Sequence, residues 1–498
     1  MDILIACDLG TSSCKLTALD LSPAAGAARI LGTASRPYPT HHAGDGRAEQ
    51  HPQDWLRAFA AAVRDLAGAG RLTGLCGLAF TGQMSAALLV DGAGEPLHPA
   101  LIWSDQRAVR ETQAAEAAMD GQAFYALTGN RLNATYTGPK LAWLARHEPA
   151  IWSRAARFVQ PKDWLVARLT GVTAMDHSDA SCTGLYDLAA GRWSEALFEL
   201  FGLPRALAPD LAEAATRIGA LKPDMAGVLG LPAGLPVILG GGDGPTTALG
   251  TGIAPGEAYA SFGTSAWISV LSPAPVIDPA RRVFSFRHVV PGLYAVTGST
   301  QNAGSALAWL LDGILQSREP GGDIDAALAA TPPGADGLLA LPYLQGERTP
   351  VWDSLAGGAM VGLRSHHTRA HLVRAFIEAI CYQLRLILDT FADCGLTPAE
   401  LRVVGGLASQ PKVMAMLAAI LRRRLVRQKA HAHATALGAG MLGAIALGAI
   451  EAGEATGWAE AEAAFEPGAK IAAFERGHAA YAALYHAVLP IQAMLRGA

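Results

Sequence analysis

Short apolar runs that end in polar, glycine-containing turns recur along the chain. The first run, residues 3–7, leads into Asp8 and a Gly-Thr-Ser-Ser turn at residues 10–13, and a second strand-like run follows at residues 16–21. Apolar runs of this length on both sides of a polar turn predict a β-hairpin. We therefore expect the chain to begin with a buried hairpin whose turn carries hydroxyl groups.

The same pattern returns in the second half of the chain. Residues 257–261 form a strand-like run, residues 263–265 form a Gly-Thr-Ser turn, and residues 267–271 form the next run. About half of the 498 residues separate the two turns. This repetition predicts a duplicated architecture with one hairpin in each half.

Helical patterns alternate with further buried strands. Residues 54–66 place apolar side chains on one helical face, and residues 372–391 read as a long, largely apolar helix. Residues 75–80 and 401–404 read as buried strands that run into glycine-containing loops. Strands mixed with helices predict an α/β layered fold in each half.

The boundary between the halves is predicted near the middle of the chain. There the apolar run 237–239 breaks into Gly240-Gly241-Gly242-Asp243-Gly244. We therefore predict an N-terminal domain over residues 1–240 and a C-terminal domain over residues 241–498. Since no long polar linker separates them, the two domains are expected to face each other along a cleft.

Composition narrows the classes of function. The formal net charge is -4, from 39 Lys and Arg against 43 Asp and Glu, which disfavours nucleic acid and anionic membranes as partners. Hydrophobic residues make up 51% of the chain and charged residues 16%, so a large core is expected and wholesale disorder is excluded. The small-residue run 434–450 is expected to be a packed helix and not a membrane span.

The six cysteines are scattered and form no Cys-x-x-Cys pair. This spacing indicates neither a zinc site nor a disulfide framework. Together with an N-terminus that lacks a basic stretch, it predicts reduced thiols, no secretory signal and a cytoplasmic protein.

Three glycine turns are candidates for binding phosphate: residues 10–13, 263–265 and Gly405-Gly406. Glycine allows main-chain amides to converge on an anion, and Thr or Ser hydroxyls add donors. Any one of these turns alone could be an ordinary tight turn, but repetition in both halves favours a nucleotide. The single G-x-G-x-x-G match, at Gly438, Gly440 and Gly443, lies in an Ala/Gly-rich helical run and predicts close helix packing, not a dinucleotide site.

Two aspartates stand at chemically informative places. Asp8 ends a buried strand before the first turn, and Asp243 lies in the glycine cluster at the domain boundary. A buried carboxylate needs a partner, so a metal ion or a reacting proton is expected at either position. The alternatives are that Asp8 caps the hairpin turn and that Asp243 caps a helix beginning near Pro245.

A series of motifs in fixed order resembles the FGGY family of carbohydrate kinases, and within it the xylulokinases most closely. The motifs are Asp8-Leu9-Gly10-Thr11-Ser12, Thr81-Gly82-Gln83-Met84, Trp103-Ser104-Asp105-Gln106-Arg107, Pro161-Lys162-Asp163-Trp164-Leu165 followed by Ser178-Asp179-Ala180-Ser181, Gly241-Gly242-Asp243, Phe262-Gly263-Thr264-Ser265, residues 341–350 and Gly405-Gly406. They extend over nearly the whole chain.

The resemblance implies two actin-like, RNase H-type domains flanking a central cleft, with the sugar held mainly by the first and ATP mainly by the second. It implies ATP-dependent phosphorylation of a terminal hydroxyl of a pentulose, with D-xylulose converted to D-xylulose 5-phosphate. Asp243 is the expected catalytic base. The other expected contacts are Gln83, Met84, Ser85, Asp105 and Asp243 for the sugar; Gly10, Thr11, Ser12, Ser13, Lys15, Gly263, Thr264, Ser265, Gly405, Gly406 and Gln410 for the nucleotide; and Asp8 and Asp243 for Mg2+.

Two departures from the family pattern leave alternatives open. Ser85 replaces the His that xylulokinases typically carry after Gln-Met, so the acceptor could be another ketose or a polyol such as ribulose, erythritol or glycerol. Leu407 replaces the third Gly of the adenosine motif. A different class, a chaperone-like or actin-like ATP-driven conformational protein, would not need Gln83 or Asp243, and retention of Asp8 and Asp243 argues against a sensor that lacks catalysis. A homodimer is left open.

Overall fold

The computed structural model describes residues 2–22, 29–469 and 471–496, which form two compact units. Unit 1 comprises Met1–Gly252, Ser272–Ala295 and His433–Ala459, and unit 2 comprises Ile253–Leu271, Val296–Ala432 and Glu460–Ala498. Each unit is described separately. The predicted domain boundary between residues 240 and 241 stays a prediction.

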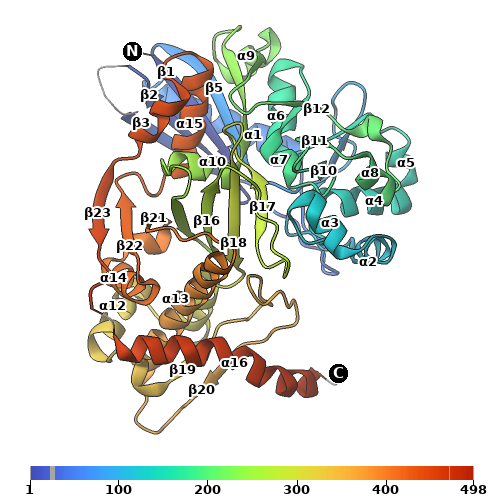
Figure 1. Ribbon diagram of the computed structural model, residues 1–498. Coiled ribbons are helices and arrows are strands. Elements are labelled where there is room, and N and C mark those ends of the chain that lie inside the picture. Colours follow the sequence, from blue (N-terminus) through green and yellow to red (C-terminus); the bar gives the residue numbers. More distant parts are fainter. Residues whose placement is uncertain (1, 23–28, 470, 497–498) are drawn as a thin grey trace. The chain divides into compact units, whose positions relative to one another are not determined.

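Unit 1 is built on a six-stranded sheet in the order β13-β14-β5-β1-β2-β3 (Figure 1). Its strands are β1 (Ile3–Leu9), β2 (Ser13–Asp20), β3 (Arg29–Pro37), β5 (Leu75–Gly82), β13 (Arg217–Ala220) and β14 (Pro236–Gly242). β1 pairs antiparallel with β2 and parallel with β5, and β14 pairs parallel with β5. The carboxyl ends of β1, β5 and β14 therefore meet at one edge of the sheet.

Helices cover both faces of this sheet. On one face α1 (Pro52–Gly68), α6 (Pro161–Thr170) and α9 (Pro223–Leu229) bury their apolar sides against alternate residues of β1 and β2. On the other face lie α10 (Asp243–Gly250) and α15 (Ala434–Ala446). Figure 1 shows α15, which comes late in the sequence, beside the first strands of the chain.

A second core in unit 1 lies beneath shorter elements and is centred on large side chains such as Phe124, Phe158 and Trp193. The remaining helices of unit 1 are α2 (Val109–Ala118), α3 (Gly121–Thr128), α4 (Thr137–His147), α5 (Pro149–Trp152), α7 (His177–Ser181), α8 (Glu195–Leu200), η2 (Arg205–Leu207) and η6 (Ala452–Trp458). The strands are β4 (Glu49–Gln50), β6 (Leu88–Val90), β7 (Ala100–Leu101), β8 (Arg157–Val159), β9 (Ala174–Asp176), β10 (Tyr186–Asp187), β11 (Arg192–Trp193), β12 (Asp210–Ala212) and β17 (Phe284–Arg287).

The strands of unit 2 run in the order β18-β16-β15-β21-β22-β23. They are β15 (Ala258–Phe262), β16 (Ala266–Ser272), β18 (Tyr294–Thr300), β21 (Glu400–Gly405), β22 (Arg424–Gln428) and β23 (Ala461–Phe465), and β19 (Leu339–Leu341) pairs separately with β20 (Ala359–Val361). β15 pairs antiparallel with β16 and parallel with β21. This pairing repeats that of β1 with β2 and β5.

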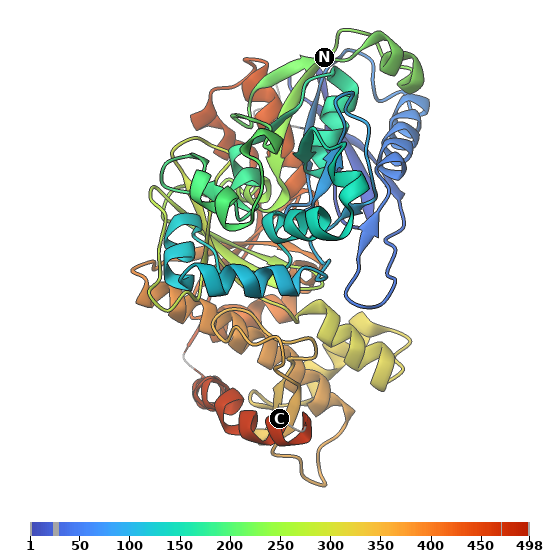
Figure 2. The same ribbon diagram turned by 90° about the vertical axis from the view of Figure 1, so that its right-hand side faces the viewer.

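The helices of unit 2 are α11 (Gly304–Ala308), η3 (Trp309–Ile314), α12 (Pro320–Ala330), η4 (Ala335–Gly337), α13 (Arg369–Asp393), η5 (Gly406–Ser409), α14 (Pro411–Leu421) and α16 (Ala472–Arg496). α16 contacts both α13 and β19, as Figures 1 and 2 show. Gly477 permits this approach, because a Cβ there would lie 2.2 Å from the hydroxyl of Tyr382.

The predicted local elements are confirmed. Both hairpins form, the expected helices become α1 and α13, and the expected strands become β5 and β21. The G-x-G-x-x-G match lies within α15, as predicted. A Cβ at Gly438 would lie 1.9 Å from the carbonyl oxygen of Thr246, and one at Gly443 would lie 2.4 Å from Leu4 Cδ2, so these glycines serve helix packing.

Among the described ranges, no helix combines the length and apolar character needed to cross a membrane.

Candidate active site

The first turn follows a carboxylate at the end of β1. Asp8 pairs with Lys15 across the hairpin, and the two side chains approach to 3.9 Å between Oδ2 and Nζ. Burial raises the pKa of Asp8, and the charge of Lys15 offsets part of that rise. The carboxylate therefore lies at the sheet edge with Lys15 as a nearby cation.

Hydrogen bonds tie the first turn to the predicted sugar-binding segments. Gln50 Nε2 donates to the carbonyl of Thr11 at 2.6 Å, and Trp103 Nε1 donates to the Thr11 hydroxyl at 2.9 Å. Gln83 Nε2 in turn donates to Gln50 Oε1 at 2.8 Å. The structure thus brings together the turn at residues 10–13, the segment after β5 and the segment after β7.

The segment after β5 contains three of the predicted sugar contacts. The side-chain oxygen of Gln83 is buried and has no hydrogen-bond partner among the described residues. Met84 packs against Gly242, where a Cβ would lie 2.6 Å from its sulfur. Ser85 has a φ of 61°, and its hydroxyl donates to the carbonyl of Cys182 at 3.1 Å and lies 2.7 Å from the Cys182 sulfur. The Ser85 hydroxyl is therefore engaged in contacts within the protein.

Asp105 is fully buried and already well supplied with donors. Its Oδ2 accepts the N–H of Ala48 at 2.8 Å and Arg107 Nη2 at 2.6 Å. Arg107 also donates to Glu49 at 2.6 Å. The Asp105 contact to sugar stays a prediction, and the structure gives this carboxylate a second role as the anchor of Arg107.

Lys140 was not singled out from the sequence, yet it connects the same two segments. Its ammonium is fully buried and donates to the carbonyls of Ser85 at 2.9 Å and Ile102 at 2.6 Å. Burial lowers the pKa of Lys140 to about 7, although Asp105 opposes the shift. In the sequence, Lys140 is a lone lysine in an apolar helical pattern, and nothing there indicated that it would be buried next to the predicted sugar segments.

Asp243 is the first residue of α10 and directly follows β14. Its Oδ1 accepts the N–H of Gly244 at 2.8 Å. The alternative that Asp243 caps a helix beginning near Pro245 is wrong, because α10 begins at Asp243 and Gly242 is the N-cap. Burial, together with the charge of Asp8, raises the pKa of Asp243 to about 7. A carboxylate with this pKa is suited to accept a proton near neutral pH.

The donors available for a divalent cation are few. Among the described residues, no three His, Cys, Asp or Glu side chains gather into a metal-binding group. Asp8 and Asp243, however, are close enough for the charge of one to raise the pKa of the other. Mg2+ typically uses one or two protein carboxylates together with substrate phosphates, so this pair fits the ion.

The second turn lies in unit 2, at the N-terminus of α11. Gly263 donates its N–H to the carbonyl of Ser265 at 2.9 Å, and Gly304 donates to the carbonyl of Gly263 at 3.0 Å. The N–H and the hydroxyl of Ser305 both donate to the carbonyl of Thr264 at 3.0 Å. These hydrogen bonds fix the backbone of the turn at the end of the hairpin.

The predicted adenosine segment adjoins this turn. Gly405 pairs with Phe262 across β21 and β15, has a φ of 92°, and would place a Cβ 2.3 Å from the Phe262 carbonyl oxygen. Gly406 is open, with its nearest such contact at 4.0 Å. Leu407 is half-buried in η5, and Gln410 is the N-cap of α14. The structure therefore brings together the residues of unit 2 that are predicted to bind the nucleotide.

Glu347 is a buried carboxylate behind the second turn to which the sequence reasoning assigned no role. Its oxygens accept the N–H groups of Gln301 and Arg348 and the hydroxyl of Thr300, each at 2.7 Å. Burial raises the pKa of Glu347 to about 7. Its position within the family-like motif at residues 341–350 was the available signal.

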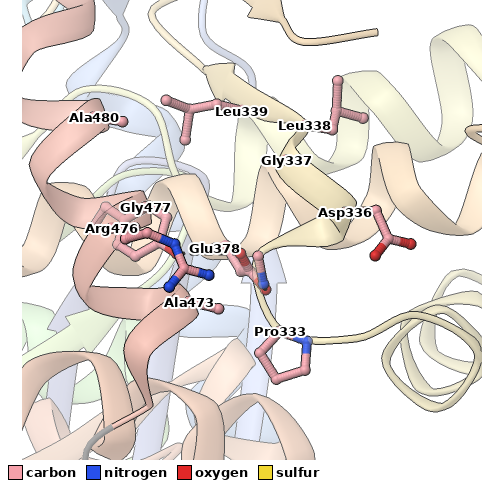
Figure 3. A pocket seen from close by; sticks show the side chains of 12 residues that line it. Pro333, Asp336, Gly337, Leu338, Leu339, Glu378, Ala473, Arg476, Gly477 and Ala480 are labelled. Atoms are coloured by element: carbon pink, nitrogen blue, oxygen red, sulfur yellow. Dashed lines mark hydrogen bonds between the residues drawn. The ribbon is translucent and has the colours of Figure 1, made fainter. Parts of the chain in front are cut away.

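Two pockets lie apart from the predicted site residues. One, of about 410 Å³, is shown in Figure 3 and lies between η4, α13 and α16 of unit 2. The other, of about 260 Å³, lies in unit 1 near His177 and Arg287. Neither contains a residue predicted to bind sugar, nucleotide or metal.

Two glycine turns on duplicated hairpins, together with a carboxylate that can accept a proton, fit an ATP-dependent phosphotransferase of actin-like fold. The comparisons agree with that class. The description "FGGY family of carbohydrate kinases, N-terminal domain" matches residues 3–250, and the corresponding C-terminal domain matches residues 258–447. The chain belongs to this family and is an ATP-dependent sugar kinase.

Individual relatives extend over nearly the whole chain. A xylulose kinase of Lactococcus lactis is 32% identical over 484 residues, which cover 96% of this chain and 95% of that protein. A glycerol kinase of Bordetella parapertussis is 32% identical over 94% of this chain and 93% of that protein. The crystal structure of xylulose kinase from Rhodospirillum rubrum has a TM-score of 0.88 and 31% identity, with 98% of this chain and 99% of that one covered. The predicted family and the α/β fold with two actin-like domains are confirmed.

Proposed function

We propose that the protein transfers the γ-phosphoryl group of ATP to the terminal hydroxyl of D-xylulose, forming D-xylulose 5-phosphate and ADP. The observation that carries the proposal is Asp243, a carboxylate with a pKa near neutrality, positioned beside the Met84 segment. The similarity to xylulose kinases over most of the chain supports the choice of acceptor.

In this reaction the hydroxyl oxygen bonds to the γ-phosphorus as the bond from that phosphorus to the β-phosphate bridging oxygen breaks. Asp243 accepts the hydroxyl proton. Catalysis of phosphoryl transfer depends mainly on positioning and charge stabilisation, so the remaining groups bind and orient. The amides and hydroxyls of the first turn (residues 10–13) and the second turn (residues 263–265) are assigned to the phosphates, with Lys15, Gly405, Gly406 and Gln410 as further nucleotide contacts.

Asp8 and Asp243 are assigned to Mg2+, because their mutual electrostatic repulsion is what a bound cation would offset. Held by these two carboxylates, Mg2+ would supply positive charge to the phosphate oxygens of ATP. Asp8 keeps Lys15 as its other cationic neighbour.

The acceptor contacts are assigned to Gln83, Met84, Ser85 and Asp105. Gln83 contributes most clearly, because its buried side-chain oxygen has no hydrogen-bond partner within the described part of the chain and would accept from a sugar hydroxyl. Ser85 is shorter than His and turned toward Cys182, so it leaves room in the acceptor site. This observation, together with the similarity to a glycerol kinase, favours another ketose or a polyol as the second candidate acceptor.

An ADP-release assay across pentuloses, hexuloses and polyols separates these acceptors. We expect the largest kcat/KM with D-xylulose. Faster turnover of a polyol than of any ketose would overturn the pentulose assignment while leaving the kinase assignment intact.

Replacement of the base tests the mechanism. Asp243→Ala should lower kcat by about 10²–10⁴-fold, the usual cost of losing a general base. ATP affinity measured without Mg2+ should be retained. Asp224→Ala is the matched control, because Asp224 also lies in the first turn of a unit 1 helix but is exposed. Near-normal turnover of Asp243→Ala would assign the base to another group.

We also propose a cytoplasmic location, supported by six cysteines that are all free. Rapid alkylation of thiols in intact cells, followed by mass spectrometry, should label all six after denaturation. A disulfide-linked pair would contradict this location.

The end of α16 supports a homodimer. Ile491, Met494 and Leu495 are 58%, 77% and 83% exposed and lie on one helical face by their spacing. Light scattering after size exclusion should give twice the mass of one chain, and Met494→Glu should reduce it. A monomer for the unmodified protein would contradict the proposal.

A further inference from the structure

A buried charge cluster lies beneath the strand ends that lead to Gln83 and Asp243. Lys162 of α6 places its Nζ 2.6 Å from Asp163, 3.4 Å from Asp176 and 3.4 Å from Asp179. All four side chains are at most 1% exposed. Buried ion pairs contribute little net stability because the charges lose their hydration. Three carboxylates around one ammonium therefore call for a role beyond stability.

A chain of hydrogen bonds connects this cluster to the peptide that precedes Asp243. Asp176 Oδ2 accepts the N–H of Ser178 at 2.8 Å and also the Ser178 hydroxyl proton. Ser178 Oγ in turn accepts the N–H of Gly242 at 3.0 Å. Gly242 is the N-cap of α10, so the bond lies where the chain turns from β14 into the helix that begins with Asp243.

Packing leaves the same peptide little room to move. A Cβ at Gly241 would lie 2.9 Å from Ser178 Oγ and 3.2 Å from Asp176 Oδ2. A Cβ at Gly242 would lie 2.6 Å from the sulfur of Met84. The backbone before Asp243 is thus held between the Asp176–Ser178 pair and the predicted sugar segment.

Electrostatics keep the cation of the cluster charged. Burial alone would lower the pKa of Lys162, but the attraction of Asp163, Asp176 and Asp179 outweighs it and raises the pKa. Burial also raises the pKa of Asp163, to about 6, and that of Asp179 above its ordinary range. Lys162 therefore supplies a permanent positive charge next to Asp176.

We propose that Asp176 and Ser178, supported by Lys162, are positioning residues that aim Asp243 at the acceptor hydroxyl. They act through the N–H of Gly242 and do not touch substrate. The inference rests on the proposed function, since it assumes that Asp243 is the base. Because a small misplacement of a reacting group lowers the rate strongly, loss of this positioning should lower kcat measurably.

The test compares two serines of α7. Ser178→Ala removes the bond to Gly242, whereas Ser181→Ala removes a hydroxyl that bonds instead to the carbonyl of Ser178 and the N–H of Arg287. For each variant, kcat for D-xylulose phosphorylation is divided by the number of D-xylulose sites measured by calorimetry. This correction removes any loss caused by misfolded protein.

For Ser178→Ala we expect kcat per site to fall by roughly 10–100-fold, while KM for D-xylulose and for ATP stays within about twofold. Ser181→Ala should leave kcat per site and both KM values unchanged. Asp176→Asn, which weakens the acceptor for Ser178, should reproduce the kcat loss and serves as the second variant if Ser178→Ala does not fold. Unchanged kcat per site in Ser178→Ala, or equal losses in Ser178→Ala and Ser181→Ala, would overturn the positioning role.

The unmodified protein distinguishes failure of the inference from failure of the proposed function. If it phosphorylates another acceptor instead of D-xylulose, only the acceptor assignment fails, and the variants are compared with that acceptor. If it phosphorylates no acceptor, both the proposed function and the positioning role are overturned.

Discussion

The first turn (residues 10–13) and the second turn (residues 263–265) occupy equivalent places in a duplicated skeleton but have different chemical surroundings. Each joins two antiparallel strands, and each hairpin has a parallel neighbour that ends in glycine, with Leu9 opposite Gly82 and Phe262 opposite Gly405. Two residues before its glycine, however, the first turn has Asp8 and the second has Ser261. The skeleton is shared, while the carboxylate belongs to unit 1 alone.

The segments that follow the parallel neighbours differ in the same way. After Gly82 comes the buried Gln83, whose side-chain oxygen has no partner in the ranges that the structure describes. After Gly405 comes Gly406, which has open space beside it in those same ranges. A polar side chain suits a hydroxylated acceptor, and an open glycine suits close approach of a flat ligand. The two scaffolds are similar in backbone pairing and differ in the side chains that follow their parallel strands.

The largest effect is expected at Asp8, the carboxylate that distinguishes the first turn from the second. Asp8→Asn removes the charge assigned to Mg2+ and should lower kcat by about 10²-fold or more, with a higher Mg2+ concentration needed for half-maximal rate. Ser261→Ala, the equivalent change in unit 2, should lower kcat less than about threefold. Steady-state kinetics with Mg2+ titration measure both, and equal losses would show that the two turns are chemically equivalent.

An intermediate effect is expected at the glycine beside the second turn. Gly405→Ala forces a Cβ into a left-handed conformation 2.3 Å from the Phe262 carbonyl oxygen and should lower the free energy of unfolding by about 2–6 kcal/mol, because backbone strain and overpacking add. Because Gly405 pairs with Phe262, the substitution should also displace the second turn and so raise KM for ATP. Gly406→Ala has room and should leave the melting temperature unchanged, as thermal unfolding would show. Similar melting temperatures for the two variants would contradict the packing argument.

The smallest expected effect concerns the carboxylate that unit 2 carries behind its turn. Because the folded pKa of Glu347 is raised from about 4.5 to about 7, the folded state retains a proton that the unfolded state has lost. Stability therefore falls as pH rises through that window, by on the order of 1–3 kcal/mol. Glu347→Gln should remove this contribution, as urea unfolding at about pH 5 and about pH 8 would show. An unchanged pH dependence would assign the proton to another group.

Local patterns were enough to predict the strands that the two halves share and one long helix of unit 2. Both hairpins, β5, β21 and α13 follow from apolar runs whose signals lie within a few neighbouring residues. The glycines of α15 were likewise assigned to packing because they lay in a helical run. Each of these inferences needed only near neighbours in sequence.

The buried charges of the site could not be predicted in this way. Lys140, Lys162 and Glu347 belong to residue types that are normally exposed, and their burial depends on distant partners. Lys140 bonds to Ile102, and Glu347 to Thr300, dozens of residues away. Such contacts appear only once the elements are assembled.

The place of α15 on the first sheet has a consequence for biosynthesis. Leu4 and Leu19 of the earliest strands pack against Gly443 and Gly440 of that helix, which the ribosome makes only after more than four hundred residues. Until then the part of that sheet face that α15 covers is exposed, and the nascent chain must keep those leucines from binding to other molecules. The sheet that is synthesised first is therefore completed by a helix that is synthesised near the end of translation.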